Sequence, residues 1–514
     1  MAPPVVQEDR AATGIRFEVY RDGQRVMSYQ PQGAMVIGPE SMPMPGDVTF
    51  QDGLLVVERN DDSAMGVALL WDMGPAGAYH METTRLQQRA KPYILNVELA
   101  RWRLMKLMQK QEDWNLFDFP RAEKFQQKFK EAASLFADAL GKLDRPAEAA
   151  ATADQALAAA VDLSEQLSAF HAELLINRRS QARQFVRHIF GCRVDSTVQN
   201  QKYKETAGSA FDYVLVPMSW KQLQPEEQVF NTESVDDWVE TLSRKRLPII
   251  GGPLVRLNEV DTPDWMFIWE HDFDTLREMA FEHVQRVVMR YRKAVAVWNV
   301  VAGLSANVLF PMSFEQIIEL TRLLVSQVKN ILPTARTLVT INQPWGEYQA
   351  KAPQSVAPVL YAEMVVQAGI NCEGFGLELE MGVPKPGMFL RDLFQISCLL
   401  DKFATLGRPL FLTAVCSPSR ATPDPADASE GRLDPSQGGR WKRPWDRQLQ
   451  AEWMEAVYRL ALSKPYVESI AWADLADISQ SMPGGGLLDD MMQPKPAFTK
   501  LQEMREQFHQ WARK

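Results

Sequence analysis

The chain has 514 residues, 46% of them hydrophobic and 24% charged, with 65 acidic against 56 basic side chains. At about 150 residues per domain, this length allows two to four folded units, and the proportions exclude a disordered chain, a coiled-coil rod and a collagen-like fibre. The net charge of −9 and the lack of an extended lysine- and arginine-rich block argue against a nucleic-acid partner.

The sequence also bears on location. No stretch has the roughly 18 consecutive apolar residues that a membrane-spanning helix needs. The first ten residues, MAPPVVQEDR, lack the basic and apolar regions of a secretory signal. The four cysteines form no C-x-x-C pair, which argues against a disulfide framework and a thiolate zinc site. We therefore expect a cytoplasmic protein without a membrane span.

Residues 1–92 are predicted to form a small antiparallel β-sandwich. Residues 48–50 and 54–58 flank the pair Asp52-Gly53, which is a strong hairpin signal. The other expected strands are residues 15–20, 68–71 and 79–82. Sandwiches of this size often bind carbohydrate, and the alternative is that this one only packs against its neighbour.

Residues 93–185 change to a helical period. Apolar residues between positions 97 and 108 form one stripe of a helix that ends near Trp114. Two long helices are predicted over residues 121–143 and 146–184, and the second is rich in alanine, a strong helix former. This helical arm either packs on the rest of the chain or serves self-association into a homo-oligomer.

From residue 186 to the end, short apolar runs alternate with helical stretches. The expected strands are residues 188–194, 213–217, 248–254, 294–301, 338–342, 374–379, 410–415 and 469–472. Apolar strands that alternate with helices are parallel and covered on both faces. Eight such units predict an α/β architecture, a (β/α)8 TIM barrel over residues 186–514, in which function resides at the C-terminal ends of the strands.

Several sequence blocks of this segment follow one another in the order of a known family. They are residues 251–257 (GGPLVRL), 263–265 (PDW), 283–291 (HVQRVVMRY), 298–303 (WNVVAG), 486–490 (GLLDD) and 494–498 (PKPAF). On these blocks, residues 186–513 resemble glycoside hydrolase family 10, the endo-β-1,4-xylanase family. The resemblance implies a barrel that acts on, or binds, an oligo- or polysaccharide.

The resemblance also implies two catalytic carboxyl groups, and neither is present. A retaining glycosidase uses one carboxyl as acid/base and another as nucleophile, about 5–5.5 Å apart. The family's acid/base position, after the fourth strand, is Gly303, and its nucleophile position, in the seventh strand, is Ala414. Glycine and alanine can neither donate a proton nor attack an anomeric carbon, so the ordinary xylanase mechanism is not expected.

The family's sugar-binding positions are changed as well. Its glutamate-asparagine pair near the second strand corresponds to Leu215-Val216, and its third-strand tryptophan and histidine correspond to Arg256 and Leu257. On the eighth strand Trp472 remains as a stacking platform for a sugar ring, whereas the later tryptophan is Gln480.

Two glutamates offer a replacement for the missing pair. Glu378 and Glu380 lie two apart on the sixth strand and so point to the same face. If that face is the barrel interior, the two like charges would raise one pKa and create an acid/base pair. The alternative, which we favour, is that Arg256, with Asn299 or Asn342, neutralises Glu380 as a structural ion pair.

Further candidates lie on the loops after the strands. Asp474 follows the eighth strand, where it either approaches the cleft or caps the next segment. After the fifth strand, Trp345 and Tyr348 are candidates for contact with a sugar, with Glu347 as a carboxylate between them; the alternative is packing over the barrel rim.

The loop over residues 417–447 is long for a compact domain, and such loops are either functional or disordered. It springs from the side of the barrel where a substrate would lie, so it is a candidate lid. Its basic and aromatic end, residues 438–445, is expected to reach an internal carboxylate such as Glu378 or Glu380, or else an acidic sugar.

Other chemistry has no support in the sequence. The six histidines show no H-x-x-x-H or H-E-x-x-H spacing, and neither a phosphate-binding glycine loop nor a dinucleotide fingerprint occurs, so no metal and no cofactor are expected. Three hypotheses remain: a non-catalytic protein that binds a carbohydrate or a partner, an active glycoside hydrolase with relocated carboxylates, and a self-assembling scaffold.

Overall fold

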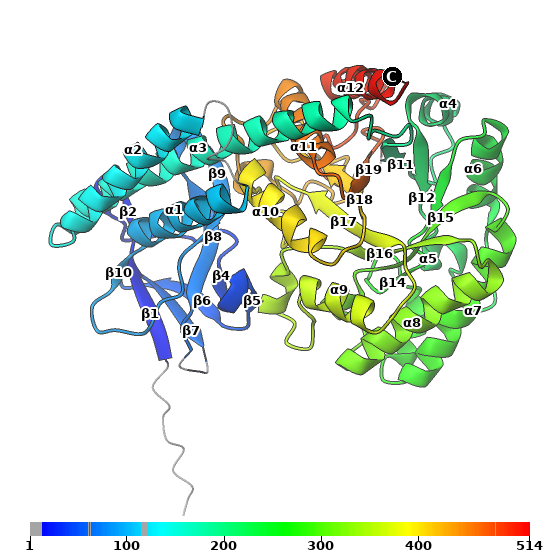
Figure 1. Ribbon diagram of the computed structural model, residues 1–514. Coiled ribbons are helices and arrows are strands. Elements are labelled where there is room, and N and C mark those ends of the chain that lie inside the picture. Colours follow the sequence, from blue (N-terminus) through cyan, green and yellow to red (C-terminus); the bar gives the residue numbers. More distant parts are fainter. Residues whose placement is uncertain (1–12, 60, 62, 115–121, 479, 514) are drawn as a thin grey trace, which may run out of the picture. The chain divides into compact units, whose positions relative to one another are not determined.

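The computed structural model describes residues 13–59, 61, 63–114, 122–478 and 480–513. The chain divides into two compact units, one formed by Met1–Ala76 and His80–Ser164, the other by Gly77–Tyr79 and Glu165–Lys514. The division falls within the long helix α3 (Pro146–Gln181) (Figure 1). The limits at residues 92 and 185 remain predictions, and the first ten residues lie outside the described part.

The first unit contains two four-stranded sheets. One has the order β10-β1-β7-β6 and the other β5-β4-β8-β9. The strands are β1 (Thr13–Glu18), β4 (Met35–Ile37), β5 (Pro43–Met44), β6 (Asp47–Gln51), β7 (Leu54–Arg59), β8 (Gly66–Asp72), β9 (Ala78–Glu82) and β10 (Tyr93–Ile94), with a separate short hairpin of β2 (Tyr20–Arg21) and β3 (Gln24–Arg25). The strands expected from the alternating pattern are all present.

The predicted hairpin at Asp52-Gly53 joins β6 and β7. Asp52 has φ 52° and Gly53 has φ 72°, the left-handed pair that a two-residue turn between antiparallel strands requires. One pairing departs from the antiparallel prediction, because β1 and β10 run parallel, with Phe17 opposite Tyr93. A parallel neighbour needs a long crossover connection, and here the chain between the two strands supplies it.

Three helices complete the first unit: α1 (Leu95–Asp113), α2 (Ala122–Gly141) and the first part of α3. Leu104, Ala132 and Ala160, one from each helix, form a buried cluster against which Phe129 and Phe136 pack. The alanine-rich α3 thus contributes one of its alanines to the buried cluster of this unit. Self-association through these helices remains a prediction.

The second unit is a closed eight-stranded parallel barrel, which confirms the predicted fold. Its strands are β11 (Phe190–Arg193), β12 (Tyr213–Val216), β13 (Ile249–Gly251) continued by β14 (Val255–Arg256), β15 (Val295–Ala302), β16 (Arg336–Ile341), β17 (Gly374–Glu380), β18 (Leu410–Cys416) and β19 (Val467–Trp472). Every neighbouring pair is parallel, and the pairing of β13 with β15 closes the ring.

Helices lie outside these strands, as Figure 1 shows. They are α4 (Gln201–Ala210), α5 (Trp220–Leu223), α6 (Glu233–Arg244), α7 (Phe273–Tyr291), α8 (Phe314–Ile331), α9 (Pro358–Gln367), α10 (Leu393–Ala404), α11 (Arg447–Ser463) and α12 (Pro496–Arg513). Across the described residues, no helix combines the length and the apolar content that crossing a bilayer demands.

The strands enclose an apolar core. One buried cluster draws on seven residues of the barrel strands: Tyr213, Leu215, Ile250, Val297, Leu338, Phe411 and Ala471. Polar and charged side chains instead occur where the strands end. The barrel therefore positions its chemistry at the C-terminal ends of the strands, which we call the mouth.

Candidate functional site

The mouth holds charged side chains from strands that are distant in the sequence. Arg193 is the last residue of β11, Arg256 the last of β14, and Glu378 and Glu380 lie near the end of β17. The residue between the two glutamates, Leu379, is 1% exposed and belongs to the other face of the strand. The glutamates therefore share the interior face, as their spacing predicted.

Two arginines neutralise these glutamates. Arg256 forms an ion pair with Glu378, and its Nε lies 3.9 Å from the carboxylate of Asp261. Arg193 lies 3.0 Å from Glu380. Glu380 is thus in an ion pair, as the favoured alternative predicted, but its partner is Arg193, and the prediction of Arg256 as that partner was wrong.

Arg193 is held in place by its own backbone neighbours. Its strand β11 pairs with β19, and Arg193 Nε donates to the carbonyl of Ala473 at 3.1 Å, just past the end of β19. This contact orients the guanidinium toward both Glu380 and the carboxylate of Asp474, 3.7 Å away. Burial lowers the pKa of Arg193, the charges of Glu380 and Asp474 raise it, and the net change is a rise. The arginine is therefore a permanent cation in the mouth.

Asp474 is bound on two sides. It accepts hydrogen bonds from the backbone nitrogen of Ser481 at 2.8 Å and from its hydroxyl at 2.7 Å, and on the other side it faces Arg193 of the mouth at 3.7 Å. The same hydroxyl lies 3.3 Å from Glu380. Burial raises the pKa of Asp474; the charge of Arg193 opposes the rise and that of Glu380 adds to it.

The two positions that the family resemblance marks carry no functional group. Gly303 has φ 69°, a left-handed conformation, and a Cβ built there would lie 2.5 Å from the side-chain nitrogen of Asn342. Ala414 is fully buried and lies opposite Glu378 in the sheet. A larger side chain at Gly303 would be strained and would displace Asn342.

The aromatic candidates do not present open faces. Trp472 is fully buried, and its Nε1 donates to the carbonyl of Gly485 at 2.8 Å, so the predicted stacking platform is not accessible in this structure. The hydroxyl of Tyr348 bonds to the carbonyl of Val356 at 2.7 Å. Trp345 is half-buried, with the guanidinium of Arg391 4.6 Å from its ring centre.

Two further polar candidates are engaged within the barrel unit. Glu347 is buried and forms an ion pair with Arg391, besides accepting a hydrogen bond from the backbone of Gly387. Asn299 is 2% exposed and accepts a hydrogen bond from Thr340 at 2.9 Å. For these residues the packing alternative describes the structure better than contact with a ligand.

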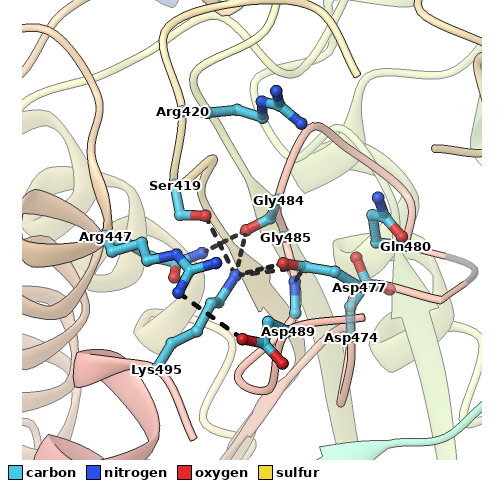
Figure 2. Close-up of polar contacts among 12 residues, drawn as sticks. Ser419, Arg420, Arg447, Asp474, Asp477, Gln480, Gly484, Gly485, Asp489 and Lys495 are labelled. Atoms are coloured by element: carbon cyan, nitrogen blue, oxygen red, sulfur yellow. Dashed lines mark hydrogen bonds and ion pairs between the residues drawn. The ribbon is translucent and has the colours of Figure 1, made fainter. Parts of the chain in front are cut away.

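Sequence reasoning missed a buried lysine that ties the loops of the mouth together. Lys495 is 1% exposed and donates to Ser419 at 3.1 Å, to the carbonyl of Gly484 at 2.7 Å and to Asp477 at 3.0 Å (Figure 2). Burial raises the pKa of Asp477 and lowers that of Lys495, and their mutual attraction opposes both changes. In the sequence, this lysine is marked only by the two prolines beside it, within the block of residues 494–498 that was noted for its resemblance to the family.

The long loop over residues 417–447 is fastened to neighbouring loops. Gln480 donates to Asp424 at 3.2 Å, and its carbonyl accepts from the backbone of Ala428 at 3.0 Å. Farther along, the carbonyl of Gly438 accepts from the backbone of Leu390 at 2.8 Å. These bonds join the loop to the segments after β17 and β19.

The basic and aromatic end of this loop reaches one internal carboxylate, other than the two named in the prediction: Trp441 donates to the buried Glu165 of α3 at 2.9 Å. Arg443 pairs with the partly exposed Glu452 of α11 at 2.9 Å. Glu378 and Glu380 are instead paired with the arginines of the mouth, Arg256 and Arg193.

No metal centre is apparent. Among the residues that the structure describes, no group of three or more histidine, cysteine, aspartate or glutamate side chains is placed to hold a metal ion.

Comparison with known proteins bears on the barrel. Residues 178–307 match the model of glycosyl hydrolase family 10. Endo-1,4-beta-xylanase B of Thermotoga neapolitana is 22% identical over 323 residues, which are 60% of this chain and 84% of that protein. The family resemblance indicated by the sequence blocks is therefore confirmed, at low identity.

Solved structures with similar barrels are also xylanases. Xylanase 10B from Thermotoga maritima is 19% identical with a TM-score of 0.47, covering 65% of this chain and 99% of that chain. Xylanase B from Clostridium stercorarium F9 is 18% identical with a TM-score of 0.47, covering 61% of this chain and 96% of that chain.

The role of Lys495 can be tested by its removal. Replacing Lys495 with Met leaves Asp477 buried without its cation, so we expect the free energy of unfolding to fall by about 3–5 kcal/mol in chemical denaturation. Adding Asp477→Leu should recover most of this loss. The control is Lys500→Met, which breaks a surface pair with Glu503 and should cost less than about 1 kcal/mol. Equal losses in Lys495→Met and Lys500→Met would contradict the assignment.

Glu165 predicts a pH dependence of stability. It accepts hydrogen bonds from Trp441 and from the backbone of Leu393. Burial raises the pKa of Glu165, and the negative charge of Asp392 raises it further. The two hydrogen bonds and the charge of Lys442 lower the pKa, but the net change is a rise. A carboxyl whose pKa is higher in the folded state binds more protons there, so stability falls as pH rises above the ordinary carboxyl pKa.

We therefore expect the wild type to lose stability relative to Glu165→Gln between about pH 5 and pH 8, measured by chemical denaturation. Glutamine does not titrate, and its single carbonyl oxygen can accept from only one of the two donors, Trp441 or Leu393, so the comparison rests on the slope of stability against pH and not on the absolute stability. Parallel stability curves for the two proteins would refute the assignment.

Proposed function

We propose that this protein is a divergent relative of the family-10 glycoside hydrolases that does not hydrolyse xylan by the retaining mechanism and that acts as a structural or partner-binding protein. The observation that carries the proposal is the pairing of each interior glutamate of β17 with a partly buried arginine, Glu378 with Arg256 and Glu380 with Arg193.

The missing carboxyl groups support this proposal. Retaining hydrolysis needs two carboxyls about 5–5.5 Å apart. At the family positions Gly303 offers only backbone, in a conformation that favours glycine, and Ala414 offers a methyl group. The family chemistry therefore has neither a proton donor nor a nucleophile at these sites.

The arginine pairs argue against a simple relocation of the chemistry. A nucleophilic carboxylate must present a lone pair to the anomeric carbon. Here the guanidinium of Arg256 binds Glu378, and that of Arg193 binds Glu380 and approaches Asp474. Charge-assisted bonds of this kind are strong, so they stabilise the ionised carboxylates as ion-pair partners rather than as attacking groups.

The aromatic side chains favour a structural role over carbohydrate binding. Sugar rings stack on open aromatic faces. Trp472 and Tyr348 are buried, and Arg391 lies over Trp345. The expected contacts with a sugar ring are thus occupied by the protein itself.

One observation favours a second candidate function, hydrolysis by relocated carboxylates. Asp474 has a raised pKa, which suits a proton donor, and it shares the Ser481 hydroxyl with Glu380, which would serve as the second carboxyl. The carboxyl groups of Asp474 and Glu380 have different surroundings, since Asp474 accepts two hydrogen bonds from Ser481 and Glu380 pairs with Arg193. An acid and a base in one catalytic pair differ in the same way. Arg193 between them is the argument against this candidate.

Hydrolysis assays separate the two candidates. We expect incubation with xylan, mannan and aryl-glycosides to release no reducing sugar above the buffer blank, and calorimetric titration with xylo-oligosaccharides to give no binding heat. Activity that disappears in Glu380→Gln and in Asp474→Asn, but persists in the control Glu430→Gln on the exposed loop, would replace the proposal with the second candidate. Binding heat without hydrolysis would restore the carbohydrate-binding role.

A further inference from the structure

The barrel unit carries a concentration of negative charge on two loops of its mouth. Residues 225–233, after β12, and residues 258–274, after β14, together contain nine acidic side chains and no lysine or arginine. We call these two segments the rim. Because the whole chain has a net charge of −9, the acidic and basic side chains outside the rim balance one another. The rim is therefore a local concentration of acidic side chains.

The two segments of the rim lie side by side. Residues 221–224 lead directly into the first segment and contact the second: the indole nitrogen of Trp265 donates to the carbonyl of Gln224 at 3.0 Å, and the backbone nitrogen of Lys221 donates to the carbonyl of Asp261 at 2.8 Å. The ammonium of Lys221 also pairs with Asp264 at 2.5 Å. A hollow of about 680 Å³ at the end of the rim is lined by Asp272, Asp274 and Glu319, together with Arg277, which pairs with Asp274 and Glu319. The acidic side chains of the rim outside these pairs carry its negative charge.

The opposite end of the barrel, where β13 and β15 begin, carries basic segments. Residues 243–248 precede β13 and residues 289–294 precede β15, and together they contain six lysines or arginines and no acidic residue. We call these segments the foot. They are adjacent because β13 pairs with β15, with Ile249 opposite Val295. Arg246 and Lys293 of the foot are exposed.

Both surfaces also expose apolar side chains. In the rim, Val260 is 78% and Ile268 76% exposed, and in the foot Met289 is 47% exposed. Large apolar side chains exposed within a charged surface are a feature of protein interfaces, whose apolar centre is surrounded by polar groups.

We propose that the protein self-associates head to tail, the rim of one copy binding the foot of a second copy. Opposite charges on two surfaces of one chain complement each other between copies, and Val260 and Ile268 of one copy would pack against Met289 of the next. Such a contact uses two different surfaces, so it generates a ring or an open fibre rather than a symmetric dimer. A symmetric dimer through the rim would instead bring like charges together.

The association is electrostatic, so salt should weaken it. We expect sedimentation velocity of the full chain at about 20 mM salt to show a sedimentation coefficient that rises with protein concentration, and at about 500 mM salt to show monomer. A full chain that stays monomeric at low salt and high concentration overturns the proposal, and the rim and foot would then serve other partners.

Charge reversal identifies the surfaces. The rim variant Glu259→Lys with Glu270→Lys and the foot variant Arg246→Glu with Lys293→Glu should each reduce the association constant at least about tenfold. An equimolar mixture of the two variants should associate again, because each variant's reversed surface is complementary to the other's. Circular dichroism of each variant checks that it is folded.

The matched control changes the net charge by the same amount as the rim variant. Asp490→Lys with Glu506→Lys alters exposed acids outside the rim and should leave association as in the wild type. Undiminished association in the rim or foot variant, or a mixture of the two that stays monomeric, overturns the head-to-tail contact.

Discussion

The mouth of this barrel depends on the pairing of its carboxylates with Arg193 and Arg256. A buried ion costs several kcal/mol unless a counter-ion and hydrogen bonds replace its water. Glu378, Glu380 and Asp474 lie close together on β17 and just after β19, so without cations their charges would repel one another. The arginines at the ends of β11 and β14 thus make an acidic mouth compatible with a folded barrel, and by the same contacts they occupy the carboxylates.

Much of the fold follows from the sequence, because a parallel barrel strand is covered on both faces and appears as a short apolar run. All eight such runs are strands, within a few residues of the expected limits. The Asp52-Gly53 turn was equally predictable, since few residue pairs adopt two successive positive φ angles. Alternation also placed Glu378 and Glu380 on one face. These features depend on local backbone preferences and on periodicity, which the sequence displays directly.

The partners of the charged residues were beyond the same reasoning. Arg193 lies at the end of a strand, and only the pairing of β11 with β19 and the contact with Ala473 direct its side chain to Glu380. Trp472 was expected at the surface of the cleft, but the turn that brings Gly485 onto its indole buries it. Lys495 acquires its role where the loop after β18, with Ser419, meets the segment after β19, with Asp477 and Gly484. Long-range contacts decide each case, and no local pattern encodes them.

The barrel topology also converts a sequence pattern into a spatial one. In an alternating β/α chain, each loop after a strand lies at one end of the barrel and each loop after a helix lies at the other. Here the rim segments after β12 and β14 contain only acidic charges, although Lys221 precedes the first of them, and the foot segments that lead into β13 and β15 contain only basic ones. Along the chain the two signs alternate and nearly cancel, whereas in the folded unit they are separated by the length of the strands. In the proposed association, the charge of each surface therefore depends on whether a residue lies in a loop after a strand or in a loop after a helix, and not on the net charge of the chain. Moving a charged residue from one kind of loop to the other would change both surfaces and leave the net charge the same.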